Sequence, residues 1–211
     1  MQRRQFLTQT SSAILGSALI LPAIATTSAS ANTQSTHNSY EIPPYEVERR
    51  DGDFEIRRYA PHVLATVTLE GGRSGTIQRG FRELAGYIFG GNARSEKISM
   101  TAPVSQTPTP SNDGQSWQVA FMMPGRYDLA DLPKAKSNNI RFSKTKPERQ
   151  AVVQFSGGWG QNKLQKQNDR LSKWMATQGL RASSAPRYYF YDDPFTLPWK
   201  RRNEVARVLA S

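Results

Sequence analysis

One pattern of apolar residues occurs twice in this 211-residue chain, first between Phe54 and Gly72 and again, 86 residues later, between Ile140 and Gly158. In each copy apolar residues alternate with other residues, and the pattern ends at a glycine pair. Such alternation is typical of strands with one buried face, and a glycine pair lets the backbone turn out of a sheet. The repeat therefore predicts a fold of two similar halves. The matched positions are Phe54 and Ile56 with Ile140 and Phe142, Pro61 with Pro147, Ala65, Val67 and Leu69 with Ala151, Val153 and Phe155, and Gly71-Gly72 with Gly157-Gly158.

A helix is predicted after each glycine pair. Apolar residues then recur at helical spacing, and a glycine beyond each run marks its end. Each copy therefore reads strand, strand, helix, strand. The helical positions are Ile77, Phe81, Leu84 and Ile88 before Gly90-Gly91, and Leu164, Leu171, Trp174 and Met175 before Gly179.

The remaining strands are predicted at 97–105, 118–123, 187–191 and 205–209, with a loop over 105–116. One helix per half is too few for the helical crossovers of a parallel α/β sheet. We therefore predict an α+β fold, in which a duplicated antiparallel sheet with pseudo-two-fold symmetry curls into a distorted β-barrel and two helices pack against it.

The N-terminus has the anatomy of a bacterial export signal over residues 1–31. Arg3-Arg4 precede Phe6-Leu7, an apolar run covers 13–25, and small residues end at Ala31. The arginine pair resembles the twin-arginine class, with an ordinary secretory signal as the alternative. We expect the mature protein in the periplasm or an equivalent extracytoplasmic compartment. Residues 32–44 are polar, end in two prolines and predict a flexible tether, so the folded domain is expected over 45–211.

Composition excludes several kinds of site. The chain has no cysteine and two histidines, which argues against iron–sulfur clusters and common zinc sites. Residues 1–31 hold two of the 28 basic side chains and none of the 17 acidic ones, so the rest carries a net charge of +9. This charge favours anionic partners such as phosphate, acidic lipid head groups or carboxylate ligands, and a basic surface without a dedicated partner is the alternative.

Hydrolytic and nucleic-acid functions find little support in the residues. No Gly-x-Ser-x-Gly motif occurs, and His37 falls in the predicted tether. Strand parity points His62 away from the apolar face that contains Val63, which is typical of a surface histidine; an iron ligand or general base is the other reading. No recognition helix accompanies the basic surface, and alternate residues of 188–191 are expected to fill the sheet core, so no nucleic-acid partner is expected.

Several segments are not explained by the repeat, and together they resemble the SOUL family of haem-binding proteins. The resemblance runs in order from Tyr45 to the C-terminus and implies a duplicated antiparallel sheet with two helices. The segments are Phe54-Glu55-Ile56-Arg57-Arg58-Tyr59, Phe89-Gly90-Gly91-Asn92, Ile98-Ser99-Met100-Thr101-Ala102-Pro103-Val104, Tyr191-Asp192-Asp193-Pro194 and Lys200-Arg201-Arg202-Asn203-Glu204-Val205.

The resemblance implies non-covalent binding of haem or a related tetrapyrrole in a shallow apolar site on the outward face of the first helix. Basic side chains would meet the propionates there, and Arg79 stands at a matching basic position. Arg82, Gly86 and Tyr87 are expected on or beside this face, and Gly86 would let a flat ring approach the backbone.

Two departures from the family pattern predict weak, five-coordinate or ligand-free tetrapyrrole association in place of tight binding through two axial ligands. Arg58 stands where one branch carries a histidine proposed as iron ligand. Arg82 and Gly86 stand where some members carry methionines. His62 and Tyr59 are the fallback candidates for an iron ligand.

The leading hypothesis is an exported, non-catalytic protein that buffers, carries or senses haem. The alternatives are an enzyme that modifies tetrapyrroles, such as a haem dechelatase, and a small-molecule effector-binding module. Peripheral contact with an anionic membrane surface is a further expected interaction, and the sequence leaves the oligomeric state open.

Overall fold

The computed structural model describes residues 35–110 and 115–210, and the predicted export signal, residues 1–31, lies outside them. Within the described residues no helix is both long and apolar enough to cross a membrane. The elements, in chain order, are β1 (Thr36–His37), β2 (Tyr40–Glu41), β3 (Tyr45–Asp51), β4 (Phe54–Tyr59), β5 (Val63–Glu70), α1 (Arg73–Ile88), β6 (Val104–Thr109), β7 (Ser116–Met122), β8 (Arg141–Lys144), β9 (Glu148–Phe155), α2 (Gln161–Thr177), β10 (Arg187–Phe190), the 3₁₀ helix η1 (Pro198–Lys200) and β11 (Asn203–Val208).

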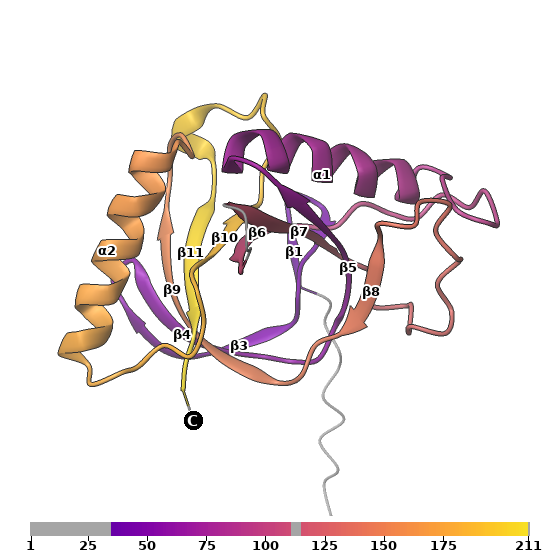
Figure 1. The fold of residues 1–211 in the computed structure, drawn as a ribbon. Helices are drawn as coiled ribbons and strands as arrows, with labels where there is room; N and C mark the ends of the chain where they lie inside the picture. Colours follow the sequence, from indigo (N-terminus) through magenta and orange to yellow (C-terminus); the bar gives the residue numbers. More distant parts are fainter. Residues whose placement is uncertain (1–34, 111–114, 211) are drawn as a thin grey trace, which may run out of the picture. The chain divides into compact units, whose positions relative to one another are not determined.

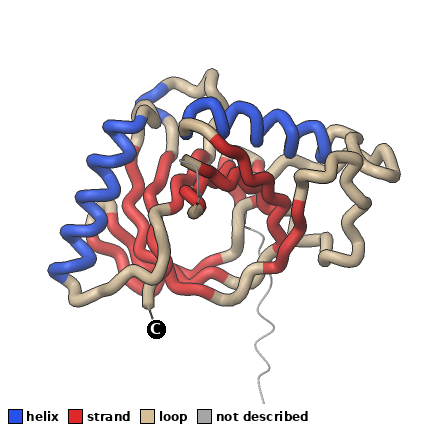
Figure 2. The backbone as a smooth tube through the Cα atoms, viewed as in Figure 1, coloured by secondary structure: helices blue, strands red, loops and turns tan. Residues whose placement is uncertain are grey.

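Nine of the described strands form one antiparallel sheet, in the order β3-β4-β9-β11-β10-β6-β7-β5-β8. The sheet curls into a half-barrel, with the two helices on its outer face (Figure 1). Figure 2 shows α1 along β5 and β7, and α2 along β9 and β11. The predicted α+β class, with two helices packed on a curled antiparallel sheet, is confirmed.

The sheet order shows how the two copies of the repeat combine. Copy one supplies β4 to β7 and copy two supplies β8 to β11, and apart from β3 the order maps onto itself when the copies are exchanged. The first strand of each copy pairs with the second strand of the other, because β4 lies beside β9 and β8 lies beside β5. The halves are therefore interlocked, and folding either half alone would leave these pairings unmade.

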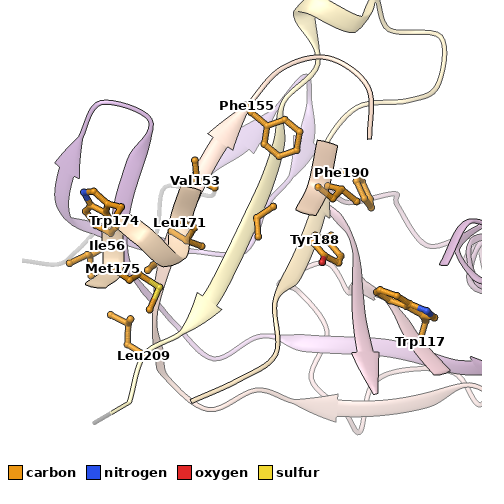
Figure 3. Packing of buried hydrophobic residues seen from close by; sticks show 13 residues of the cluster. Ile56, Trp117, Val153, Phe155, Leu171, Trp174, Met175, Tyr188, Phe190 and Leu209 are labelled. Atoms are coloured by element: carbon orange, nitrogen blue, oxygen red, sulfur yellow. The ribbon is translucent and has the colours of Figure 1, made fainter. Parts of the chain in front are cut away.

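Each helix covers an apolar cluster on the outer face of the sheet. The cluster under α2 includes Phe155, Leu171 and Trp174 (Figure 3), and Phe54 stacks on Trp174 with ring centroids 5.0 Å apart. The cluster under α1 is centred on Val67, Leu84 and Val119. Together they bury the alternate apolar positions that define the repeat.

A glycine brings α1 unusually close to the sheet. A Cβ atom on Gly80 would lie 2.7 Å from two carbons of Val119 in β7, a distance that packed carbons do not reach. The absence of a side chain at position 80 therefore sets the separation of α1 and β7.

Residues 35–44, for which the sequence predicts a tether, instead pack onto the domain. They form the β1–β2 hairpin, and Ile42 is 5% exposed in a third apolar cluster, with Val152 and Tyr189, on the inner face of the sheet. His37 contacts Asp192 with its Nε2 atom 2.9 Å from the carboxylate. The prediction of a tether rested on the polar composition of this segment, and composition does not show its contacts with residues remote in sequence.

The strand predictions around residue 105 need two corrections. Residues 97–103 make only isolated bridges and contain the cis peptide bond Ala102-Pro103, so the strand begins at Val104. The predicted loop is wrong for residues 105–109, which belong to β6. Because β10 pairs with β6 only at 104–106, Pro108 has a neighbouring strand, β7, on one side only, and sheets tolerate proline at such edge positions.

Candidate functional site

The outward face of α1 carries exposed basic, aromatic and glycine residues. Arg79, Arg82 and Gly86 are exposed, as the sequence predicts. Phe81 and Phe89 on the same stretch are 40% and 63% exposed. This face therefore joins positive charge to apolar surface, which are the two properties that a flat carboxylate-bearing ligand needs.

The two arginines lie one helical turn apart and differ in how they are held. Arg79 donates from Nη2 to the Glu70 carbonyl, 2.5 Å away, which ties its guanidinium to the end of β5. Arg82 makes no hydrogen bond or ion pair with the described residues. Side chains three residues apart on a helix are neighbours, so both guanidiniums can reach one anionic ligand. Arg79 is the more fixed of the two and Arg82 the more adaptable.

The surface around Gly86 is open. A Cβ atom placed on Gly86 would meet nothing within 4 Å, so a planar ring could contact the helix backbone there. Phe81 is held in place by an edge contact with Phe121, with ring centroids 5.4 Å apart. Gly86 thus leaves the helix backbone accessible beside the two arginines, whereas Phe81, about 140° further round the helix, lies at its flank against the sheet.

Tyr87 does not lie on this face. Its side chain is 1% exposed, packs against Phe142 and donates from its hydroxyl to the Pro133 carbonyl at 2.9 Å. Burial, with the nearby Glu96 carboxylate, raises the pKa of Tyr87 to about 12. The helix is rotated so that Gly80, Leu84 and Tyr87 face the sheet, and Tyr87 supports the helix from below.

The two candidate iron ligands also lie away from α1. Strand parity places His62 on the inner side of β5, where its Nδ1 is 2.9 Å from the Ala60 carbonyl oxygen and burial lowers its pKa. Tyr59 is 3% exposed and its hydroxyl accepts a hydrogen bond from Arg57. No described contact links either residue to α1, so a tetrapyrrole on the α1 face would have no imidazole or phenolate from these residues.

Residues 35–110 and 115–210 contain no group of three or more acidic or histidine side chains that could hold a metal ion.

Two segments singled out in the sequence meet in a buried ion cluster on the inner face of the sheet. Arg57 of β4 donates from Nη1 and Nη2 to the two carboxylate oxygens of Glu204 in β11, at 2.8 and 3.0 Å. Glu55 accepts from Arg57, and Arg202 donates to Glu204. Burial alone would raise the pKa of Glu204, but the charges and hydrogen bonds of the two arginines hold it below its usual range. Arg57 and Glu204 are 1% and 0% exposed, so this cluster braces the scaffold.

Sequence reasoning missed this cluster, although a signal was present. Arg57 lies between the outer-face residue Ile56 and the exposed Arg58, so strand parity alone directs it to the inner face. Glu204 likewise precedes the buried Val205. An inward charge on each of two strands predicts an ion pair once those strands are known to share a sheet.

Asn92, in the corner after α1, has a similar supporting role. It is fully buried and donates to the carbonyls of Tyr87 and Glu96. It thereby fixes the C-terminal end of α1.

The outward face of α2 bears a shallow groove of about 430 Å³. Asp169 lies among its cations, and Arg170 is already paired with Asp53 at 3.0 Å. An acidic side chain among the lining residues opposes a dianionic ligand, so we place the candidate site on α1. The groove is lined by Asn162, Gln165, Lys166, Asp169, Arg170 and Lys173.

Comparison with known proteins gives the family. The family model described as SOUL heme-binding protein matches residues 40–208, and the chain belongs to this family. It is 29% identical over 181 residues to Heme-binding protein 2 of Mus musculus, covering 81% of this chain and 87% of that protein. It is 28% identical over 169 residues to Heme-binding protein 2 of Homo sapiens, covering 77% and 80%.

Solved structures support the fold alone. The C-terminal domain of EcmrR superposes with a TM-score of 0.59 at 12% identity, covering 79% of this chain and 98% of that domain. A structure described as a hydrolase from Listeria innocua superposes with a TM-score of 0.54 at 12% identity, covering 77% and 94%. Both structures thus share the overall fold of this chain.

Proposed function

We propose that this chain is an exported, non-catalytic protein that binds haem or a related tetrapyrrole on the outward face of α1 and buffers, carries or senses it. The observation that carries the proposal is membership of the SOUL heme-binding family across residues 40–208. The exposed arginines and the open surface at Gly86 support the choice of α1.

The binding mode follows from the chemistry of this face. The ring would lie over the open helix backbone at Gly86, where apolar contact is favourable. One propionate would meet Arg79 and the other Arg82 through charge-assisted hydrogen bonds. Since His62 and Tyr59 lie on the inner side of the sheet, iron would gain no bond from either side chain. Affinity would then rest on ring contacts and the two carboxylates, and the iron would add little.

Titration with hemin and with iron-free protoporphyrin IX tests both parts of the proposal. We expect a saturable shift of the Soret band with hemin, and dissociation constants for the two ligands within roughly threefold of each other because no axial bond contributes. Absence of a saturable shift would exclude the proposed function. Much weaker binding of protoporphyrin, with loss of the difference in His62→Ala, would instead show that His62 ligates the iron.

Export is tested separately by following the full chain in a bacterial host. We expect cleavage near Ala31 and recovery of the shorter product outside the cytoplasm. Replacement of Arg3 and Arg4 by lysine should block this maturation if the signal is of the twin-arginine type. Normal processing of that variant would assign an ordinary secretory signal.

A further inference from the structure

Three large apolar side chains are gathered on the segment that joins β10 to β11. We call residues 193–201 the aromatic loop. Phe195, Leu197 and Trp199 are 94%, 46% and 69% exposed. Scattered exposed apolar residues are ordinary, but three of this size within five positions form a patch of the kind that marks an interaction site. In Figure 1 the loop is the yellow segment at the top, near the start of both helices.

The aromatic loop is well braced. The Asp193 carboxylate accepts hydrogen bonds from the amides of Phe195 and Thr196, at 2.7 and 3.0 Å. Arg201 donates to the carbonyls of Thr196 and Pro194, both at 2.7 Å. The guanidinium of Arg201 also lies 4.4 Å from the ring centre of Trp159. The loop therefore holds its apolar side chains outward in a defined conformation.

The charges in and beside the aromatic loop are mostly positive, with one exposed acidic side chain, Asp193. Lys200 and Lys163 are exposed, and Lys163 lies 5.9 Å from the ring of Phe155 on the neighbouring strand β9. The amides of Phe195 and Thr196 lower the pKa of Asp193, so its carboxylate stays ionised and offsets part of the neighbouring positive charge. Apolar side chains with cationic side chains close by are complementary to a lipid surface that carries negative head groups.

We propose that the aromatic loop docks this protein on an anionic lipid bilayer, with Phe195, Leu197 and Trp199 in the interfacial layer and Lys200 and Lys163 against the head groups. Tryptophan and phenylalanine are suited to this layer, and a tryptophan can keep its indole N–H among polar groups while its ring is buried. The three apolar side chains project from a loop that is flanked by lysines. This combination of projecting apolar groups and nearby cations fits a lipid surface better than a protein groove. The inference is independent of haem binding.

Quenching of Trp199 by lipid tests the proposal on the full chain. Vesicles contain phosphatidylcholine with one quarter phosphatidylglycerol, and a fraction of the lipids carries brominated acyl chains. Trp117 and Trp174 are buried and Trp159 is partly buried, so Trp199 is the most exposed tryptophan of the described residues. We expect bromolipid to quench the wild type and to quench Trp199→Phe much less. Bromolipid quenches only tryptophans in contact with the acyl chains, so membrane contact through any other part of the chain leaves the fluorescence of Trp199 unchanged.

Co-sedimentation with the same vesicles measures the strength of docking. Phe195→Ser/Trp199→Ser should lower partitioning by at least about tenfold, because two large apolar groups are lost. Leu129→Ser, which removes an apolar side chain that is 43% exposed in another loop, is the matched control and should stay within about twofold. Lys200→Gln should lower partitioning about fivefold on these vesicles and leave binding to pure phosphatidylcholine unchanged.

Equal quenching of the wild type and Trp199→Phe, or equal sedimentation of the double variant and Leu129→Ser, would overturn the proposal. Self-association of the wild type in the absence of vesicles, if it is lost in the double variant, would also overturn the proposal. It would show that the aromatic loop binds a second copy of this chain. Hemin titration involves no vesicle, so its outcome stands apart from these results.

Discussion

The outward faces of α1 and α2 are equivalent by the internal symmetry but differ in what they can bind. When the helices are aligned on their buried residues, Leu84 on Leu171 and Ile88 on Met175, Arg79 matches Lys166, Arg82 matches Asp169 and Gly86 matches Lys173. The α1 face has two arginines and an open glycine, whereas the α2 face has an acidic group and a lysine at the last two positions. The duplication therefore gives two similar helix faces, and a few residue differences make only the α1 face suitable for a flat dianionic ligand.

The inner face shows a second difference between the copies. Arg57 and Glu204 form a buried ion pair between β4 and β11. The repeat places Ser143 and Gln118 at the equivalent positions, so the other end of the sheet has no such pair there. We infer that the Arg57–Glu204 pair stabilises the end of the half-barrel next to α2, and that no equivalent ion pair stabilises the end next to α1.

The largest expected effect comes from breaking this buried pair. Arg57→Ala would leave Glu204 fully buried with Arg202 as its remaining cation and the Tyr191 hydroxyl as a neutral donor, and we expect a loss of about 3–5 kcal/mol in the free energy of unfolding. Urea denaturation followed by circular dichroism measures this loss. Ser143→Ala at the equivalent exposed position should change stability by less than about 0.5 kcal/mol. A similar small change in both variants would refute the asymmetry.

The next effect concerns how closely each helix packs on the sheet. Gly80 of α1 corresponds to Gln167 of α2, so only α1 needs a glycine at this position. Gly80→Ala should lower stability by about 1–2 kcal/mol, because the clash with Val119 outweighs the better helix propensity of alanine. Gly86→Ala, where the added methyl group meets open space, should instead raise stability by about 0.5–1 kcal/mol. Thermal unfolding of the two variants compares them directly, and stabilisation by Gly80→Ala would contradict the close contact.

The smallest effect is a pH dependence at His62, whose counterpart in the second copy is Glu148. Burial lowers the pKa of His62, so the unfolded chain binds its proton more readily than the folded chain does. The free energy of unfolding should therefore fall as the pH drops through the ordinary histidine range near 6.5. His62→Gln should weaken this dependence between pH 8 and pH 5 in denaturant titrations. An identical slope in both proteins would show that His62 is not the group responsible.

The sequence predicted the parts of the fold that depend on periodicity. Alternation at Ala65 and Ala151 located the long strands, and helical spacing located α1 and α2. The exchange of strands between copies was not predictable, because the pattern in β4 records which face is buried and carries no information on which strand lies beside it. The β1–β2 hairpin was missed for a related reason, since its order comes from contacts such as His37 with Asp192, which are remote in sequence.

The candidate site was predicted in part. Arg79, Arg82 and Gly86 lie outward as expected, but Tyr87 does not. The apolar stripe predicted for α1 was Ile77, Phe81, Leu84 and Ile88. The helix buries Leu84 and Ile88 as expected, but it also buries Gly80, a residue that apolar periodicity does not count. Close packing at a glycine rotates the helix toward Tyr87 and leaves Phe81 partly exposed. Such a rotation can be found only when the facing residue, here Val119, is known.

The central claim is that the α1 face, and not its symmetry partner, binds the tetrapyrrole. Hemin titration of two matched double variants tests it most directly. Arg79→Ala/Arg82→Ala should weaken hemin binding at least about tenfold, because each charge-assisted hydrogen bond contributes roughly 1.5–3 kcal/mol when it is shielded from water and less at an exposed site. Lys166→Ala/Lys173→Ala removes the same number of cations from α2 and should leave the affinity within about twofold. An equal loss of hemin affinity in the two variants would show a non-specific response to charge. A loss of affinity only in the Lys166→Ala/Lys173→Ala variant would place the site on α2 and contradict the account.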